Sequence, residues 1–175
     1  MPIRFGKNTV VYQPTVILDS PKKEIVFGDN CSIGQFCFIG PNKLIAEDYV
    51  EICPYCSLHG GGDIYIGKGV GVGWGVRIVP ATFTTTGQYH SDLVVAENPD
   101  ACETIRGSVT IEEGVWLAAN VILCVTKKRP HLRIGKFSQI GAFSYVDKDI
   151  PPYSIVHPVQ NLKIIQAPQP EKSQT

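Results

Sequence analysis

The sequence predicts an all-β protein, a parallel β-helix built from repeats of six residues. Large apolar side chains recur at every sixth position over long stretches, and Gly or Ala follows many of them. A period of six fits neither an α-helix nor one long strand, whose periods are 3.6 and 2. It fits short strands joined by tight turns, each strand forming one side of a coil. The repeat positions are Phe27, Ile33, Ile39, Ile45, Ile52, Leu58, Ile66, Val72, Ile78, Ile111, Leu117, Leu123, Ile134, Ile140 and Val146.

The repeats group by three, which predicts about five coils with three flat faces over residues 27–146. Spacing within a coil is six, apart from an interval of seven between Ile45 and Ile52. The longer intervals all separate the third face of one coil from the first face of the next, so the inserted residues leave the solenoid at one corner. Insertions on one edge of a repeat array tend to mark its binding face. Three histidines fall on these insertions: His59, His90 and His131.

The flanking segments are predicted to close and end the solenoid. Residues 1–26 are expected to cap the first coil, because a terminal coil is otherwise exposed. An inserted loop is expected at 83–108, and a short C-terminal segment at 147–165, which begins where prolines end the repeat. The polar residues 166–175 are expected to be a disordered tail. Residues 1–165 are then one domain, a length sufficient for a substantial core.

Composition and charge exclude several classes of protein. The chain carries 16 basic and 16 acidic residues, so its formal charge of zero does not indicate nucleic-acid binding. The first residues have no apolar run followed by a small-residue cleavage site, so no signal peptide is predicted. No run approaches the ~18 apolar residues that a membrane span needs. We therefore expect a cytoplasmic protein with no membrane span.

The positions of the six cysteines indicate packing rather than disulfides or metal binding. Cys53 and Cys56 form a CxxC pair, but no second pair or His pair completes a metal site. A buried thiol behaves as a small apolar side chain. Three cysteines come four positions after a repeat position, two come one position after, and one lies outside the pattern: Cys31, Cys37 and Cys56; Cys53 and Cys124; and Cys102.

Three features resemble the hexapeptide-repeat acyltransferases, and within them the galactoside, maltose and xenobiotic acetyltransferase branch. They are the long His-containing excursion, the segment Val-Trp-Leu-Ala-Ala-Asn-Val at 115–121 and the segment Lys-Asp-Ile-Pro-Pro at 148–152. The resemblance covers roughly residues 25–165. It implies a left-handed coil and a homotrimer with active sites between subunits. It also implies acetyl transfer from acetyl-CoA to a hydroxyl or amine of a sugar-like acceptor.

The resemblance assigns catalysis to His90, within Thr-Gly-Gln-Tyr-His at 86–90. A sugar hydroxyl becomes a good nucleophile only as its proton is removed, and imidazole is largely neutral and able to accept that proton near pH 7. Asp92 is the candidate to orient the imidazole. Three other carboxylates on the loop compete for that role: Glu97, Asp100 and Glu103.

The same resemblance predicts the binding residues. Tyr89 and Trp116 are expected to line the acceptor pocket. The backbone at Ala119 and Ala142 is expected to contact the pantetheine arm of CoA. The side chain of Lys148 is expected to contact the CoA phosphates, and Lys163 is a candidate for the terminal CoA contact. No metal ligand is predicted.

Two other functions stay open from the residues alone. The chain could be a non-catalytic β-helix scaffold, because a fold does not imply an activity. It could also be a zinc hydratase like the γ-type carbonic anhydrases, which bind zinc through three histidines between subunits. His59, His90 and His131 would then be the ligands, although zinc requires tight ligand geometry.

Overall fold

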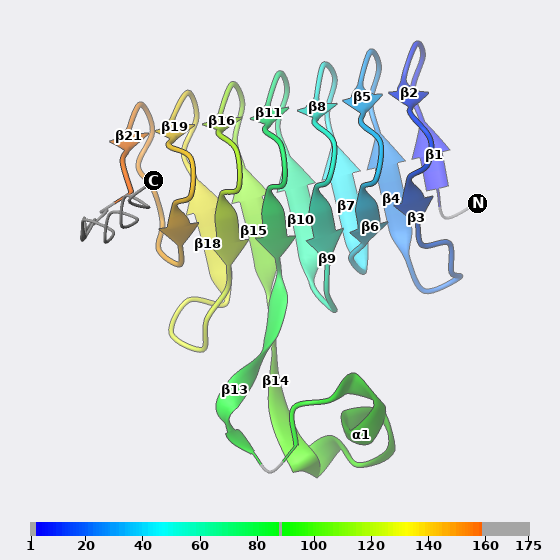
Figure 1. Cartoon of the computed structure of the whole chain (residues 1–175), viewed down its shortest axis with the longest axis vertical. Helices are drawn as coiled ribbons and strands as arrows, with labels where there is room; N and C mark the ends of the chain where they lie inside the picture. Colours follow the sequence, from blue (N-terminus) through cyan, green and yellow to red (C-terminus); the bar gives the residue numbers. More distant parts are fainter. Residues whose placement is uncertain (1–2, 88, 159–175) are drawn as a thin grey trace, which may run out of the picture.

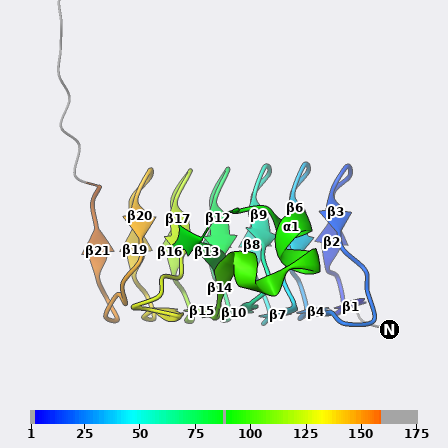
Figure 2. The same ribbon diagram turned by 90° about the horizontal axis from the view of Figure 1, so that it is seen from below.

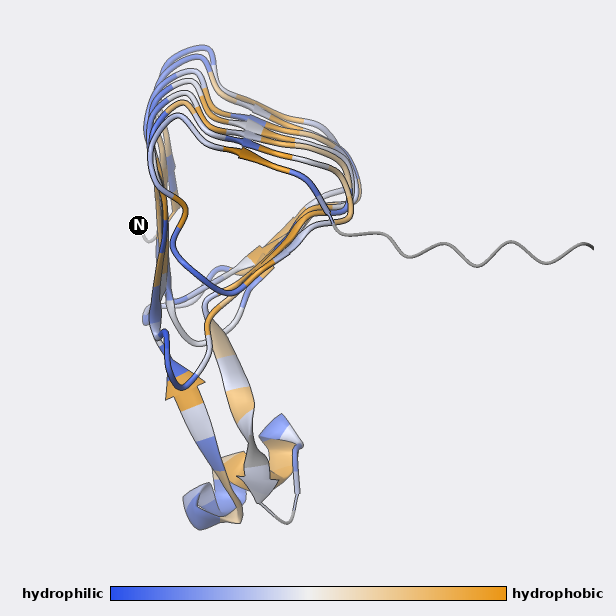
Figure 3. Ribbon diagram, turned by 90° about the vertical axis from the view of Figure 1, so that its left-hand side faces the viewer, coloured by the Kyte–Doolittle hydropathy of each residue, from blue (hydrophilic) through white to orange (hydrophobic). Residues whose placement is uncertain are grey.

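The computed structural model describes residues 3–87 and 89–158 and confirms the predicted left-handed parallel β-helix, with about six turns. Three parallel sheets form the walls of a triangular solenoid, and Figure 3 shows its open cross-section end-on. We call the sheets faces A, B and C in the order in which the chain visits them. The corners between them are the AB, BC and CA corners. The strands stack coil upon coil along the long direction of the solenoid (Figure 1).

Each of the first six coils contributes one strand to each face, and the last coil contributes a strand to face B only. Face A contains β1 (Ile3–Phe5), β4 (Glu24–Phe27), β7 (Lys43–Ala46), β10 (Asp63–Ile66), β15 (Ser108–Ile111) and β18 (His131–Ile134). Face B contains β2 (Val10–Val11), β5 (Ser32–Ile33), β8 (Glu51–Ile52), β11 (Gly71–Val72), β16 (Trp116–Leu117), β19 (Gln139–Ile140) and β21 (Ile155–Val156). Face C contains β3 (Val16–Ile17), β6 (Phe38–Gly40), β9 (Ser57–His59), β12 (Arg77–Val79), β17 (Ile122–Cys124) and β20 (Tyr145–Val146).

The core is a column of apolar side chains inside the solenoid. Equivalent positions pair in register from coil to coil, as Ile33 does with Ile52. Inward and outward positions alternate along the strands, so Ile64 and Ile66 are buried while Tyr65 faces outward. Burying one such aliphatic side chain stabilises the fold by about 1.5–3 kcal/mol. The repeat of six therefore places one buried anchor on each face of each inner coil, whereas anchors of the terminal coils, such as Phe5, stay partly exposed.

The N-terminal boundary predicted from the sequence is wrong. The described part of the predicted cap at 1–26 is a coil instead, because β1, β2 and β3 pair with β4, β5 and β6. Phe5, Val11 and Ile17 follow one another at intervals of six and pair with equivalent residues of the next coil. A longer connection at the CA corner, between Ile17 and Phe27, separates this coil from the regular pattern.

The register predicted for β7 is also wrong by one residue. Leu44 and Ala46 point inward, with 0% and 2% of their surfaces exposed, whereas Ile45 faces outward. Ala46 pairs with Phe27 on one side and Ile66 on the other. The interval from Ala46 to Ile52 is then the regular six, and the extra residue lies at the CA corner like the other insertions. A small residue at an anchor position concealed the register.

The repeat continues past the predicted end at Val146. Ile150 forms a parallel bridge with Ile134, and β21 pairs with β19. The prolines at 151 and 152 lie in the AB corner of this last coil. The tail predicted at 166–175 lies outside the described residues.

The excursion from the CA corner is an arm with regular structure rather than a loop beginning at residue 83. Strand β13 (Ala81–Gly87) runs antiparallel to β14 (Cys102–Arg106), and α1 (Asp92–Glu97) and η1 (Pro99–Ala101) form the tip. The arm projects from the solenoid, and α1 is displaced toward the N-terminal coils (Figures 1 and 2). In the described part of the chain, no helix is long and apolar enough to cross a membrane.

Candidate active site

His90 lies on the arm, where the chain turns back after β13. Its ring is exposed and meets the ring of Phe83 edge-on, with 6.2 Å between centroids. Its Nε2 lies 3.1 Å from the backbone carbonyl oxygen of Thr84. A carbonyl only accepts hydrogen bonds, so in the neutral ring Nε2 carries the proton and donates it. The free lone pair of the imidazole is then on Nδ1, which this contact assigns as the basic atom.

The carboxylates predicted around His90 have separate surroundings. Asp92 lines a cavity of about 260 Å³ together with His59 and Arg106, on the side of the arm that faces the N-terminal coils. Glu103 forms an ion pair with Lys127, with 2.7 Å between Oε2 and Nζ. Among the described residues, the hydrogen-bond partner of the His90 ring is the Thr84 carbonyl and not a carboxylate. The imidazole is therefore oriented by the arm's own backbone within one chain.

A second cavity, of about 390 Å³, lies between the base of the arm and face C. The residues that line it are Thr82, Phe83, Thr84, Thr86, Ile105, Cys124, Val125, Thr126, Lys127 and Tyr145. The Lys127–Glu103 ion pair ties this side of the solenoid to β14. Burial raises the pKa of the Cys124 thiol and that of the Tyr145 phenol, so both groups are protonated near neutral pH.

The other predicted site residues lie away from the arm within one chain. Trp116 is on face B, with 51% of its surface exposed. Ala119 and Ala142 occupy equivalent positions in the BC corner of adjacent coils, where the Phe143 N–H donates to the Ala119 carbonyl at 3.0 Å. The arm leaves from the CA corner, across the solenoid from face B (Figure 3). Tyr89, next to His90 on the arm, is likewise separated from Trp116.

The two lysines predicted to contact CoA, Lys148 and Lys163, lie in different parts of the chain. Lys148 is in the CA corner of the last coils, so face C lies between it and the two alanines. Lys163 lies outside the described residues. In the basic segment Lys127-Lys128-Arg129, Arg129 is paired with Asp149, with 2.8 Å between Nη1 and Oδ2. Within one chain, Lys148 therefore does not share a surface with Ala119 and Ala142.

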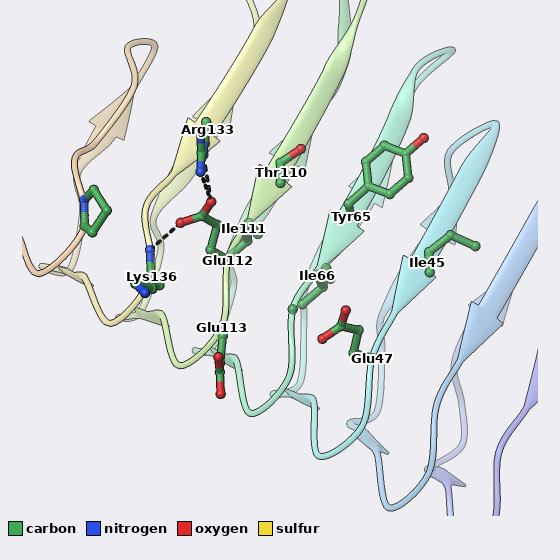
Figure 4. A pocket seen from close by; sticks show the side chains of 12 residues that line it. Ile45, Glu47, Tyr65, Ile66, Thr110, Ile111, Glu112, Glu113, Arg133 and Lys136 are labelled. Atoms are coloured by element: carbon green, nitrogen blue, oxygen red, sulfur yellow. Dashed lines mark hydrogen bonds and ion pairs between the residues drawn. The ribbon is translucent and has the colours of Figure 1, made fainter.

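A groove of about 520 Å³ on face A was not predicted from the sequence (Figure 4). Glu112 is at its centre and accepts hydrogen bonds from Arg133 Nε at 2.7 Å and from the Lys136 N–H at 2.8 Å. The hydrogen bond from Arg133 is the main reason why the pKa of Glu112 lies below its ordinary value. Arg133 and Glu112 neutralise each other, so the charged side chains of the groove outside this pair are Glu47, Glu113 and Lys136.

The three histidines do not converge. The His59 ring meets the Phe38 ring edge-on at 5.7 Å, and His131 Nδ1 lies 3.0 Å from Ser108 Oγ. Within residues 3–87 and 89–158, no group of three or more His, Cys, Asp or Glu side chains could hold a metal ion.

Comparison with curated proteins found similar sequences, although no protein-family model matches the chain. The chain is 32% identical over 154 residues to galactoside O-acetyltransferase from Lactococcus lactis, covering 82% of this chain and 64% of that protein. It is 29% identical over 181 residues to bifunctional protein GlmU from Thermotoga maritima, covering 87% of this chain and 38% of GlmU. The chain thus spans less than two thirds of each of these curated relatives.

Solved structures share the fold. AntD, an N-acyltransferase from Bacillus cereus in complex with dTDP and 3-hydroxybutyryl-CoA, superposes with a TM-score of 0.70 at 20% identity. The match covers 87% of this chain and 76% of AntD. A hexapeptide-repeat acetyltransferase from Vibrio cholerae in complex with acetyl-CoA superposes with a TM-score of 0.54 at 21% identity, covering 87% of this chain and 64% of that one.

Proposed function

We propose that this chain, a member of the hexapeptide-repeat acyltransferase superfamily, transfers an acetyl group from acetyl-CoA to a hydroxyl or amine of a sugar-like acceptor. Two relatives support the two substrates. One is named a galactoside O-acetyltransferase, and AntD was solved with dTDP and an acyl-CoA. The acceptor class and the role of each residue are part of the proposal.

The proposal rests on the separation between the base on the arm and a surface of small side chains in the BC corner, which we call the shelf. The arm presents the exposed imidazole of His90 with a free lone pair on Nδ1. The BC corner presents a strip of small side chains at Ala119 and Ala142, beside which an extended pantetheine arm can lie close to the backbone. Within one chain these features are on different sides of the solenoid. We therefore propose that the arm of one copy reaches the shelf of a neighbour, in a homotrimer with three equivalent sites.

The chemistry follows from that placement. As the acceptor oxygen or nitrogen attacks the thioester carbonyl carbon, Nδ1 of His90 takes its proton. The new bond to carbon forms, the carbon–sulfur bond breaks, and the proton passes to the departing CoA sulfur. A positioned base of this kind contributes about 10²–10⁴ in rate. Tyr89 beside the base and Trp116 beside the shelf would border the acceptor, and Lys148 is a candidate for the CoA phosphates.

Complementation between two inactive variants tests the shared site. His90→Ala removes the base but keeps the shelf, whereas Ala142→Arg blocks the shelf but keeps the base. Each variant alone should be nearly inactive in acetyl transfer from labelled acetyl-CoA to a panel of sugars. Mixed trimers from equal co-expression should recover up to about one quarter of the wild-type rate, because that fraction of the sites combines an intact arm with an intact shelf.

A matched control uses two changes in the same half of the site. Co-expressed His90→Ala and His90→Gln chains should stay inactive, because no intact base is present in any trimer. Recovery in the control pair would mean that His90 is not the base. Absence of recovery in the test pair, from trimers of normal size, would place the whole site within one chain. A wild-type protein that transfers no acetyl group to any acceptor would contradict the proposed activity itself.

A further inference from the structure

A trough separate from the arm runs along the boundary between face B and the BC corner, and its Trp74 end adjoins the shelf, because Trp74 is equivalent to Ala119 in the adjacent coil. It has a volume of about 320 Å³ and is lined by residues of β5 and β8 and by residues of the turns that follow β2, β5, β8 and β11. Tyr12 is at its N-terminal end and Trp74 at the other, and both side chains are about half exposed. Successive coils are about 4.7–4.9 Å apart, so the two rings bracket roughly 14 Å of the surface.

The floor of the trough is formed by small side chains, because the repeat favours a small residue directly after each face B anchor. The position after each face B anchor is Gly34 in the second coil and Cys53 in the third, and both line the trough. Gly34 has no room for a side chain, since a Cβ there would lie 2.5 Å from the backbone nitrogen of Pro54. Tyr12 occupies the equivalent position in the first coil, where its large ring forms a wall instead of floor.

The polar groups in the trough are hydrogen-bonding rather than cationic. Ser32, Gln35 and Glu51 supply a hydroxyl, an amide and a carboxylate, and none of the described residues that line the trough is basic. A carboxylate with an amide and a hydroxyl can both accept from and donate to ligand hydroxyls. The same carboxylate repels a phosphate. Two apolar ring surfaces around such groups fit a ligand with apolar C–H faces and a hydroxylated rim.

The trough leads directly toward Trp116. Glu51, Gly71 and Trp116 are in register on three successive coils of face B. The Trp116 indole lies over Gly71, because a Cβ at that position would be 3.2 Å from Trp116 Cδ1. An acceptor lying in the trough would therefore present one end at the indole that we place beside the reacting centre.

We propose that this trough binds the sugar part of the acceptor, and that the acceptor is an uncharged or amino sugar without a phosphate at this position. The inference rests on the proposed acetyltransferase function. It adds Trp74 and Tyr12 as walls that contact the sugar and Glu51 as the group that selects against anionic acceptors. Tyr12 and Trp116 are four coils apart, roughly 19 Å, so a ligand that reaches from one to the other would be an oligosaccharide rather than a single sugar.

Fluorescence of Trp74 tests the inference without turnover. The chain has two tryptophans, so Trp116→Phe leaves Trp74 as the only one. This variant is titrated with methyl glycosides of neutral and amino hexoses, with their disaccharides, and with a UDP-hexose as anionic probe. The Trp74 emission should change with the uncharged or amino sugars, most strongly with disaccharides. Tyr12→Ala should weaken that binding by roughly tenfold or more, as loss of a central aromatic contact does.

The controls separate the inference from the proposed function. Tyr49→Ala, at an exposed aromatic residue outside the trough, should leave sugar binding unchanged. Glu51→Gln should weaken binding of amino sugars more than that of neutral sugars. A Trp74 response to the UDP-hexose alone would overturn the inference. So would acetyl transfer whose acceptor KM is unaffected by Tyr12→Ala and Trp74→Ala. Sugar binding in a protein that transfers no acetyl group would instead contradict only the proposed function.

Discussion

The imidazole Nε2 of His90 lies 3.1 Å from the backbone carbonyl oxygen of Thr84, six residues earlier on the same arm. Because a carbonyl can only accept, this contact leaves Nδ1 of the neutral ring free to take a proton. Phe83 holds the ring edge-on from one side. The arm therefore positions a base through its own hairpin, and within residues 3–87 and 89–158 no carboxylate hydrogen-bonds to the ring.

Removing this base should lower the rate without loosening the fold. His90→Ala is expected to reduce kcat/KM for acetyl transfer by about 10²–10⁴, or about 3–5 kcal/mol of transition-state stabilisation. Affinity for CoA, measured by calorimetry, should change little because the shelf is intact. His59→Ala is the matched control and should keep most of the activity. Near-normal turnover in His90→Ala would mean that the base lies elsewhere.

The register of β7 can be tested with two neighbouring residues. Leu44 is fully buried, so Leu44→Ala should lower the free energy of unfolding by about 2–5 kcal/mol. Ile45 faces the groove on face A, so Ile45→Ala should cost well under half of that. Urea unfolding followed by circular dichroism measures both. Equal losses, or a larger loss for Ile45→Ala, would contradict the register.

The ion pair between Glu112 and Arg133 should make the folding stability depend on pH. Arg133 is the main cause of the lowered pKa of Glu112 in the folded state. The ion pair therefore adds to the free energy of unfolding above the ordinary glutamate pKa of ~4.3, and this stabilisation is lost as pH falls through the folded-state pKa of Glu112. The gain is below about 1 kcal/mol because Arg133 is largely exposed. Glu112→Gln should flatten this part of the stability–pH curve. Glu113→Gln, which removes a neighbouring charge, should leave its shape unchanged.

The thiols should differ in reactivity according to burial. Cys31, Cys37, Cys56 and Cys102 are buried, whereas Cys53 and Cys124 are partly exposed. Burial is the main reason why the pKa values of the two partly exposed thiols are raised, so even these should react slowly at neutral pH.

Titration with a thiol reagent measures this difference. At most two of the six thiols should react in the native protein, and all six after denaturation. Rapid reaction of a third thiol before unfolding would show that a coil corner opens in the native state.

The sequence determined the kind of fold because its signal is local and repeated. An anchor at every sixth residue occurs on each face of nearly every coil, so a single misread position does not alter the conclusion. The corner from which the arm leaves was also predictable, since the long intervals all fall between the third face and the first. The cysteines followed the same logic, and Cys31, Cys37 and Cys56 are buried inside the coils as predicted.

Only the tertiary structure decided which residues share a surface and which of two neighbouring residues faces the core, because the spacing of residues in the sequence does not encode either. Ala46 is an anchor because Phe27 and Ile66 lie above and below it, although the neighbouring Ile45 has the more typical side chain. His90 and Trp116 are on opposite sides of the solenoid because three short faces intervene, so sequence spacing could not relate them. The trough depends on Tyr12 and Trp74 being three coils apart on one wall, and only stacking of the coils brings such distant residues onto one surface.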